Sequence, residues 1–298
     1  MRILLFGRNG QVGWELQRAL APLGHVIALE RRGSGGYVAD FADPESLALA
    51  VRQWQPDAIV NAAAYTAVDR AEGEADLARA INAEAPAVLA REAAARGAWL
   101  VHYSTDYVFD GSGDQPRDES APTGPLSVYG QTKLEGEQAV VASGARHLVF
   151  RTSWVYAARG GNFVRTMLRL AGERDRLRVV HDQVGAPTGA ELIADVTAHA
   201  LRSALATPSL SGVYHLAADG ETSWHGYARH VIEWARDHGH PVRVAPDAIE
   251  PIATTEYPTP ARRPLNSRLD TTRLRQAFGL TMPPWQAGVD RMLGEALG

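Results

Sequence analysis

Residues 3–13 read ILLFGRNGQVG, and this stretch decides the fold. Its apolar half, Ile3–Phe6, is the near-continuous hydrophobic run of a strand that is buried on both faces of a parallel sheet. Gly7, Gly10 and Gly13 follow at spacings of three, where a tight turn would lead into a helix. Glycines there let the backbone approach a diphosphate, which the unpaired N–H groups of a helix N-terminus attract. The stretch therefore predicts a dinucleotide site, although a tight turn without a ligand also uses glycine.

Outward from this stretch, short apolar runs alternate with longer amphipathic segments as far as about residue 152. The alternation is typical of an α/β protein and predicts a Rossmann-type, doubly wound parallel sheet covered by helices. The expected strands are Ile3–Phe6, His25–Leu29, Ala58–Asn61, Trp99–Tyr103 and Leu148–Thr152, and the expected helices are Gln11–Ala21, Pro44–Gln53, Asp76–Arg96 and Val128–Val141.

Beyond Arg151 the alternation becomes irregular. We expect residues 1–152 to form a dinucleotide-binding domain, to which residues 182–215 return. Residues 153–181 and 216–298 would form a smaller, irregular α/β lobe that binds the substrate. The proline-rich segment Pro241–Pro264 predicts extended, loop-rich chain. The other expected elements are helices Phe163–Ala171, Ala190–Leu205, Trp224–His238, Thr271–Phe278 and Trp285–Leu297, and strands Leu177–Val180 and Val213–Leu216.

Composition excludes several kinds of protein. The 298 residues contain no cysteine, which excludes disulfides, thiolate metal sites and thiol nucleophiles. A formal net charge of -4 argues against an electrostatic hold on nucleic acid or on an anionic membrane. The early apolar run is far too short for a signal peptide or a membrane span. We therefore expect a cytoplasmic protein that acts on a small molecule.

The second expected strand is followed by charged residues that bear on the cofactor. Glu30 ends this segment, and Arg31 and Arg32 come directly after it. An acidic side chain here binds an unphosphorylated ribose, whereas arginine favours a 2′-phosphate. Signals for NADH and for NADPH are thus both present, and the choice stays open. A solvated charged turn is the alternative for either arginine.

Lys133 is the only lysine in the chain, and it follows Tyr129 by four positions in the string YGQTK. This spacing places both side chains on one face of a helix. Arginine cannot replace lysine where a compact ammonium is needed. A neighbouring ammonium would lower the pKa of the phenol and let Tyr129 exchange a proton near neutral pH. The alternative is that Tyr129 only packs and Lys133 is solvated.

Ser104 and Thr105 come directly after the expected strand Trp99–Tyr103. Ligands of open parallel sheets bind at the carboxyl ends of the strands. A hydroxyl there would donate to a substrate carbonyl oxygen while Tyr129 delivers the proton. Serine and threonine at strand ends also serve as simple caps.

The glycine triplet, Thr105, Tyr129 and Lys133 together resemble the extended short-chain dehydrogenase/reductases. Longer strings narrow the resemblance to those members that reduce a 4-keto sugar linked to dTDP. These strings are Gly7–Leu16, Asn61–Glu72 (NAAAYTAVDRAE), Tyr103–Gly111 (YSTDYVFDG), Tyr129–Lys133, Arg151–Tyr156 (RTSWVY), Asp182–Ala190 (DQVGAPTGA) and Arg263–Asp270 (RPLNSRLD).

The resemblance implies a reaction and its catalytic residues. Hydride would pass from NADPH or NADH to C4 of dTDP-4-dehydro-L-rhamnose, which gives dTDP-L-rhamnose. Tyr129 is then the general acid, Lys133 adjusts it, and Thr105 polarises the C4 carbonyl. The implied binding residues are Gly10, Gln11 and Val12 for the diphosphate, Asp40 and Phe41 for the adenine, Ala64, Tyr65, Thr66 and Tyr103 along the cofactor, and Asp106 and Trp154 for the sugar nucleotide.

Two further groups of residues could either bind a ligand or be ordinary surface charges. Arg262 and Arg263 could clamp the substrate's diphosphate through paired N–H bonds, or be ordinary surface charges. The resemblance also implies a homodimer in which magnesium is held by glutamates. The matching positions are Glu15, Glu191 and Glu295, for which oxygen ligation suits magnesium and a solvated surface is the alternative.

Two other functions stay open at this point. A sugar-nucleotide epimerase or dehydratase would use the same scaffold, but dehydratases place a glutamate where this chain has Tyr107 after Asp106. A non-catalytic regulatory subunit of the methionine adenosyltransferase type would also share the fold. Retention of Thr105, Tyr129 and Lys133 counts against it.

Overall fold

Six parallel strands form the central sheet of the chain. The computed structural model describes residues 1–30 and 39–297. The strands run in the order β10-β5-β4-β3-β1-β2, and every neighbouring pair is parallel. Their bounds are β1 Arg2–Phe6, β2 His25–Leu29, β3 Ala58–Asn61, β4 Trp99–Thr105, β5 Arg146–Thr152 and β10 Gly212–His215. This sheet confirms the predicted Rossmann-type fold.

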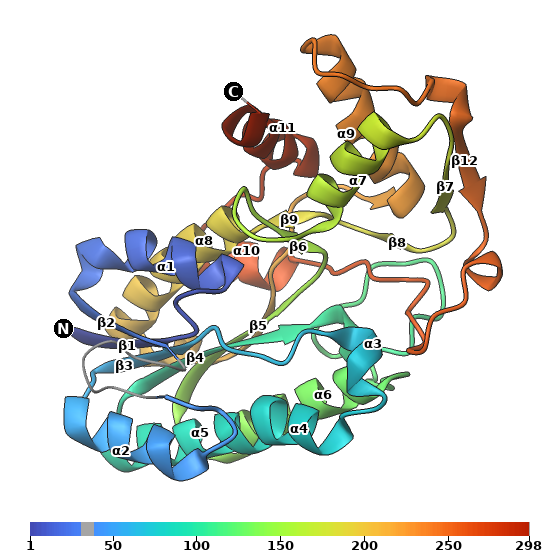
Figure 1. Cartoon of the computed structure of the whole chain (residues 1–298). Coiled ribbons are helices and arrows are strands. Elements are labelled where there is room, and N and C mark those ends of the chain that lie inside the picture. Colours follow the sequence, from blue (N-terminus) through green and yellow to red (C-terminus); the bar gives the residue numbers. More distant parts are fainter. Residues whose placement is uncertain (31–38, 298) are drawn as a thin grey trace.

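Alternate side chains of each strand enter two separate cores, because successive residues of a strand point to opposite faces. Ile3 and Leu5 pack with helices α1 (Gln11–Leu20), α8 (Ala190–Ala206) and α10 (Thr272–Phe278) on one face. Leu4 and Phe6 pack with α2 (Pro44–Trp54), α5 (Ala85–Arg96) and α6 (Val128–Ala142) on the other. Figure 1 shows these two helical layers on either side of the sheet.

A third apolar core lies outside the sheet, in the upper right of Figure 1. Helices α7 (Phe163–Glu173), α9 (Trp224–Asp237) and α11 (Trp285–Leu297) contribute most of it. Strand β7 (Leu177–Val180) pairs in parallel with β12 (Ile249–Ile252) beside these helices. The short strands β6 Val155–Tyr156, β8 Val184–Gly185, β9 Thr188–Gly189 and β11 Thr222–Ser223 complete this part.

Two predicted segments differ in detail from the structure. The single helix expected over Asp76–Arg96 is interrupted, because α4 (Ala75–Arg79) leads into a π-helical turn, η2 (Ala80–Glu84), before α5 begins. Pro86 lacks the N–H that a continuous α-helix would direct back to residue 82, and the wider turn accommodates that loss. The loop-rich segment Pro241–Pro264 contains β12, because Ile249 is buried in the third core.

The remaining short elements connect the layers. They are α3 (Val68–Ala71), the 3₁₀ turns η1 (Ala21–Leu23), η3 (Asp106–Val108), η4 (Pro208–Leu210), η5 (Pro246–Ala248) and η6 (Thr254–Glu256). Across residues 1–30 and 39–297, no helix has both the length and the apolar character that a bilayer crossing requires.

Candidate active site

The glycine-rich turn between β1 and α1 is closed by the backbone itself. Gly7 has a φ of +84°, and a Cβ there would lie 2.7 Å from the carbonyl carbon of Ala62 on the neighbouring strand segment. A Cβ at Gly13 would lie 2.0 Å from the carbonyl oxygen of Gly7. Gly10 caps α1 without any side-chain hydrogen bond to the helix. The N-terminal amides that follow it, from Gln11 and Val12 onward, therefore begin a helix next to a turn that only glycine can make, and this fits a bound diphosphate.

The residues expected near the adenine end surround this turn. The Asn9 amide donates to the Glu30 carboxylate at 2.5 Å, which joins the glycine-rich turn to the end of β2. Phe41 is buried and packs edge-on against Phe6, with ring centroids 5.7 Å apart. Asp40 accepts a hydrogen bond from the backbone N–H of Ala42. Arg31 and Arg32 lie outside the described residues, so their bearing on cofactor choice stays a prediction.

The segment after β3 contains the other residues that are expected along the cofactor. Ala64 and Tyr65 are half-buried there, and Thr66 is exposed. The Tyr65 N–H donates to Asn82 Oδ1 at 2.8 Å, and the Tyr65 hydroxyl donates to Glu74 at 2.6 Å. This loop is thereby held in place from two sides.

Tyr129 and Lys133 lie one helical turn apart on α6, as the sequence predicts. Ser127 caps the helix by accepting from the N–H of Gly130. A Cβ at Gly130 would lie 2.3 Å from the Tyr107 carbonyl oxygen, so only glycine lets α6 approach η3 this closely. The rings of Tyr107 and Tyr129 meet edge to face, with centroids 5.4 Å apart. Close packing thus fixes the tyrosine against the end of β4.

Thr105 and Asp106 lie at the carboxyl end of β4, and both are buried. The Thr105 hydroxyl donates to Asp106 Oδ1 at 3.0 Å and accepts from the Tyr107 N–H at 3.2 Å. The other oxygen of Asp106, Oδ2, is buried and has no hydrogen-bond partner. Loss of water raises the pKa of Asp106 to about 6, against the hydrogen bonds that it accepts. A hydroxyl donor and an unpaired carboxylate oxygen therefore lie side by side.

The expected effect of Lys133 on Tyr129 is corrected by the structure. Loss of water around the hydroxyl raises the pKa of Tyr129, and a hydrogen bond with Thr105 only partly opposes this rise. The reason is geometric: the Lys133 ammonium donates to the Tyr103 carbonyl oxygen, at 2.5 Å, and not to the phenol. In the free chain Tyr129 is therefore a protonated phenol at neutral pH, which is the form that a proton donor needs.

Lys133 is itself buried, and burial lowers its pKa to about 8 although the charge of Glu137 opposes the fall. Tyr103 contributes its carbonyl oxygen to this lysine. Its side chain turns to the opposite face of the sheet and forms a 2.8 Å hydrogen bond with Thr197 of α8. Only the backbone of Tyr103 therefore faces the Lys133 side.

Trp154 follows β5 in a strained conformation. Its φ is +48°, in the left-handed region that residues other than glycine rarely adopt. The indole stacks on Trp224 of α9, with centroids 3.7 Å apart and planes 12° from parallel. Trp224 in turn donates from Nε1 to Gln183 at 3.0 Å. The strain is thus held by packing between the sheet and the third core.

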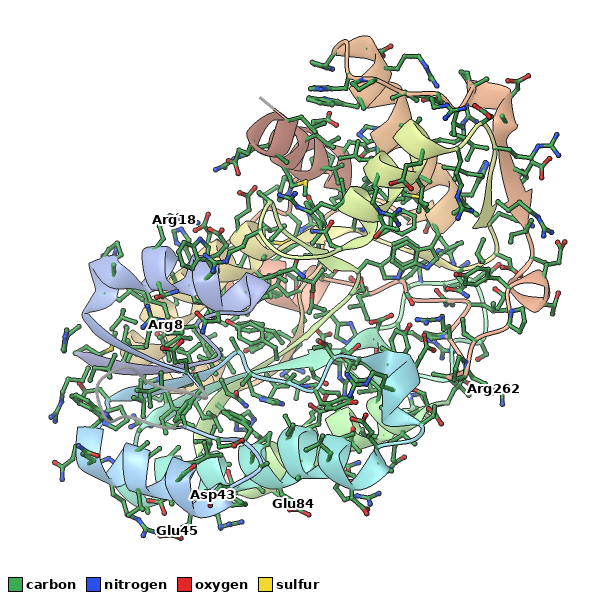
Figure 2. The ribbon with its side chains drawn as sticks, in the orientation of Figure 1. Arg8, Arg18, Asp43, Glu45, Glu84 and Arg262 are labelled. Carbon is green, nitrogen blue, oxygen red and sulfur yellow. The ribbon has the colours of Figure 1, made fainter. Side chains whose placement is uncertain are left out.

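Arg263 reaches back from the C-terminal part to the segment after β3. It donates to Asp69 of α3 at 2.7 Å and to the Tyr107 hydroxyl at 3.3 Å. Its neighbour Arg262 is exposed and points outward at the rim of the molecule (Figure 2). The two arginines therefore differ, because Arg263 contacts Tyr107, which packs on Tyr129, whereas Arg262 points outward.

The expected magnesium ligands face arginines. Glu15 lies 3.5 Å from Arg18, which Figure 2 shows on α1. Glu191 and Glu295 lie 3.5 Å and 3.2 Å from Arg291, which sits between them. Within the part of the chain that the structure describes, no three acidic or histidine side chains are grouped to hold a metal ion. The described residues of one copy therefore do not hold the three glutamates as a ready-made metal site, and the magnesium site stays a prediction.

Two sets of buried polar side chains beside the site were not predicted from the sequence. Asn82 of η2 donates to Tyr65 O at 3.1 Å and to Thr132 at 3.3 Å, which ties the loop after β3 to α6. Glu137, one turn beyond Lys133, pairs with Arg151 of β5, and both are buried. The four-residue spacing from Lys133 to Glu137 was the available signal for the second group. For Asn82, the signal was an amide in an apolar helix shortly before a proline.

This arrangement defines a class of protein. The chain has a Rossmann sheet with a glycine-rich first turn, a threonine at the end of β4 and a tyrosine–lysine pair on the next helix. These features define an extended short-chain dehydrogenase/reductase, an NAD(P)H-dependent oxidoreductase.

Comparison with known proteins narrows the class to a family. The family described as the RmlD substrate binding domain matches residues 1–297. The dTDP-4-dehydrorhamnose reductase of Escherichia coli K12 is 57% identical over 295 residues, which cover 99% of this chain and 98% of that protein. The reductase of the same name from Burkholderia thailandensis is 50% identical, with 97% of each chain covered. The chain belongs to the dTDP-4-dehydrorhamnose reductase family.

Solved structures agree with this membership. The dTDP-4-dehydrorhamnose reductase of Bacillus anthracis, in complex with NADP, has a TM-score of 0.87 at 34% identity, with 99% of each chain covered. The UDP-glucose 4-epimerase of Thermus thermophilus, in complex with NAD, has a TM-score of 0.80 at 20% identity, with 100% of this chain and 99% of that chain covered, and shares the fold. The predicted reductase is confirmed over the epimerase, dehydratase and regulatory alternatives.

Proposed function

We propose that this chain reduces the C4 ketone of dTDP-4-dehydro-L-rhamnose to dTDP-L-rhamnose, with NADPH as the hydride donor and NADH as the alternative donor. The observation that carries the proposal is the grouping of Thr105, Tyr129 and Lys133 at the carboxyl end of β4 in a chain of this family. The NADP found with the Bacillus anthracis relative supports NADPH.

Each catalytic residue has a separate task in this proposal. The reduced nicotinamide supplies the hydride when it is bound. Tyr129 delivers its phenolic proton to the C4 oxygen, and Thr105 donates a hydrogen bond to that same oxygen as negative charge develops on it. Lys133 then faces a phenolate, which an ammonium stabilises. Its bond to the Tyr103 carbonyl oxygen holds the ammonium in a fixed position meanwhile.

The cofactor would lie along the glycine-rich turn. Gln11 and Val12 present backbone N–H groups to its diphosphate, and Gly7, Gly10 and Gly13 allow the tight turn that leads into this helix N-terminus. Glu30 binds the adenosine ribose, and Asp40 and Phe41 flank the adenine. The backbone from Ala64 to Thr66 forms the opposite wall with Tyr103.

The sugar nucleotide would lie between the sheet and the third core. Asp106 accepts a sugar hydroxyl through its unpaired Oδ2, and Trp154 packs against the sugar nucleotide. Arg263 binds the diphosphate in exchange for part of its contact with Asp69. Residues 1–152 with 182–215 thus act as the cofactor domain, and residues 153–181 with 216–298 act as the substrate lobe.

The proposal includes the assembly and the place of action. We propose a homodimer, in which a magnesium ion would need glutamates from two copies, because Glu191 and Glu295 of one copy are both paired with Arg291. A cytoplasmic location accords with the use of reduced NADPH and of a nucleotide sugar. Light scattering of the purified chain, with and without a chelator, tests both the dimer and the role of a metal.

A direct assay tests the reaction. The purified full-length chain is mixed with dTDP-4-dehydro-L-rhamnose and either NADPH or NADH, and loss of the reduced nicotinamide absorbance is followed. Formation of dTDP-L-rhamnose, identified by NMR, is the expected result. A well-folded preparation that turns over with neither cofactor would overturn the proposal. Oxidised cofactor retained through purification would instead favour an epimerase.

A further inference from the structure

A buried ion pair lies directly behind the lysine of the active site. Glu137 of α6 and Arg151 of β5 have side chains only 5% and 6% exposed. Arg151 Nε donates to one oxygen of Glu137 at 3.0 Å, and Nη2 donates to the other at 2.5 Å. Both carboxylate oxygens are therefore occupied by the guanidinium, in the bidentate arrangement that fixes a carboxylate most firmly.

The far side of Arg151 is closed by neutral groups. Its guanidinium lies 5.1 Å from the centre of the Phe109 ring. Nη1 of the same guanidinium lies 3.4 Å from Nε2 of His215. His215 Nδ1 lies 2.9 Å from the carbonyl oxygen of Arg117, to which it can only donate, so Nε2 is left as the acceptor. Burial lowers the pKa of His215 to about 3, which keeps the imidazole neutral.

Lys133 and Glu137 share one face of α6, because they are four residues apart. The charge of Glu137 acts on the buried Lys133 ammonium, and the same carboxylate pairs with Arg151. His102 and Tyr103 on β4 and Tyr129 on α6 are the other ionisable residues that face Lys133 or lie one turn from it, and Asp106 and Tyr107 of η3 face Tyr129. Asn82 and Thr132, from η2 and α6, are neutral.

We propose that Glu137 is a positioning residue for the reductase reaction, whose carboxylate, anchored by Arg151, keeps Lys133 protonated and seated on the Tyr103 carbonyl oxygen. Glu137 acts through its charge, since its oxygens are engaged by Arg151. Only the predicted effect on the rate rests on the proposed function. The effect on the protonation of Lys133 does not.

The alternative is that the pair only helps the fold. Burying an ion pair is a weak way to gain stability, because desolvation offsets the attraction and an apolar pair of similar size often serves as well. Desolvation of this pair is costly, and the pair lies beside the ammonium of the active site. A role in holding the charge of that ammonium is therefore open to it. Burial already lowers the pKa of Lys133 to about 8, and the charge of Glu137 is the effect that opposes this.

The chain allows a direct measurement, because Lys133 is its only lysine. Protein labelled with [ε-¹³C]lysine gives one lysine signal, whose chemical shift against pH reports the protonation of Lys133 without assignment. The free chain is used, so no cofactor or substrate is needed. In Glu137→Gln we expect the midpoint to fall by about one pH unit or more. Glu137→Asp keeps the charge and should restore most of the wild-type midpoint.

Glu137→Gln leaves Arg151 buried without a counter-ion and is at risk of not folding. The double variant Glu137→Leu/Arg151→Met removes both charges and avoids that risk. It too should lower the Lys133 midpoint, by less than Glu137→Gln does, because Glu137 is the charge that raises the Lys133 pKa and Arg151 is not among the groups that act on that lysine. Glu135→Gln is the matched control. Glu135 lies on the same helix, is partly exposed and pairs with Arg79, and its substitution also removes one negative charge. The control should leave the midpoint unchanged.

The rate gives the second readout. Loss of the lysine proton should define the alkaline limb of the kcat profile, and this limb should move to lower pH together with the NMR midpoint. On the alkaline side kcat should then fall about tenfold for each pH unit by which the midpoint moves. A double variant that folds and titrates like the wild type and Glu135→Gln would overturn the proposal. A lower NMR midpoint in a chain without reductase activity would uphold the effect of Glu137 on the protonation of Lys133 and reject the proposed function.

Discussion

Arg263 and Asp69 join two segments 194 residues apart, with Nη2 of the arginine 2.7 Å from Oδ2 of the aspartate. The backbone N–H of Ala261 donates to the other aspartate oxygen at 3.3 Å. Arg263 also donates to the Tyr107 hydroxyl, and the Tyr107 ring packs on Tyr129. The C-terminal segment is thereby held next to Tyr129, the proposed proton donor, with a guanidinium that has N–H groups to offer an anion.

Arg263→Gln should weaken binding of the sugar nucleotide and spare the chemical step. A hydrogen bond to a charged group contributes about 1.5–3 kcal/mol, so we expect KM for dTDP-4-dehydro-L-rhamnose to rise about 10- to 100-fold while kcat changes little. The ion pair with Asp69 is partly exposed and contributes little to stability, so the variant should fold. Steady-state kinetics with varied substrate at saturating NADPH measures the change.

Arg262→Gln is the matched control for that variant. It removes the same charge one residue away, from a side chain that points outward. Its KM should stay close to that of the wild type. Equal increases in KM for both variants would mean that a general positive field, and not Arg263 itself, attracts the substrate.

Gly13→Ala should destabilise the fold through the turn between β1 and α1. The added Cβ would lie 2.0 Å from the Gly7 carbonyl oxygen, and backbone atoms there cannot move without shifting α1 from the sheet. We expect the Tm to fall by several degrees or the chain to be insoluble. Gly294→Ala in α11 meets nothing within 4 Å and should keep or slightly raise the Tm, because alanine favours a helix. Differential scanning fluorimetry of the two variants decides the matter.

The helices and strands were predictable where a sequence pattern is compatible with only one kind of element. Strands such as Ile3–Phe6 must be buried on both faces. Four expected elements have the bounds that the structure gives them, namely His25–Leu29, Ala58–Asn61, Leu177–Val180 and Trp285–Leu297. The π-helical turn at Ala80–Glu84 was not predictable from periodicity, because it depends on a missing N–H at Pro86. Strand β12 was not predictable either, since it pairs with β7, which lies about 70 residues earlier in the chain.

For the candidate site, spacing along the chain predicted which side chains meet but not what surrounds them. Tyr129 and Lys133 do share a face of α6, yet the direction of the Tyr129 pKa depends on burial, which no local pattern reports. The bond from Lys133 to Tyr103 joins residues 30 positions apart. The Asp69–Arg263 contact joins residues much further apart, so only the folded chain brings them together.

Asp106 should make the stability of the chain depend on pH. Burial raises its pKa to about 6 from the ordinary 3.8, so the folded state holds the proton more tightly than the unfolded state. Stability that is present below about pH 4 is therefore lost as the pH rises through 6. A pKa difference of this size corresponds to on the order of 3 kcal/mol. Asp106→Asn cannot ionise, so its stability relative to the wild type should increase between pH 4 and 7, as measured by urea unfolding.

Asp118→Asn provides a control of opposite sign. Hydrogen bonds from Ser120 lower the pKa of Asp118, so this carboxylate stabilises the folded state at neutral pH and loses that effect as the pH falls. The Asn variant should therefore lose stability relative to the wild type as the pH rises. If Asp106→Asn and Asp118→Asn follow the wild-type pH curve in parallel, the burial of Asp106 has no energetic consequence and the argument fails.

Tyr129→Phe removes the proposed proton donor and leaves its packing, because phenylalanine keeps the ring that meets Tyr107 edge to face. Loss of a positioned general acid costs about 100- to 10,000-fold, so kcat should fall at least about 100-fold. Binding of NADPH, measured by its fluorescence, should change little. Thr105→Val should also lower kcat, since it removes the hydroxyl beside Asp106, whereas Thr105→Ser keeps that hydroxyl and should recover much of the rate. A Tyr129→Phe variant with near-normal kcat would mean that another group delivers the proton. The buried carboxyl of Asp106, whose pKa of about 6 lies close to neutral pH, would then be the group to test.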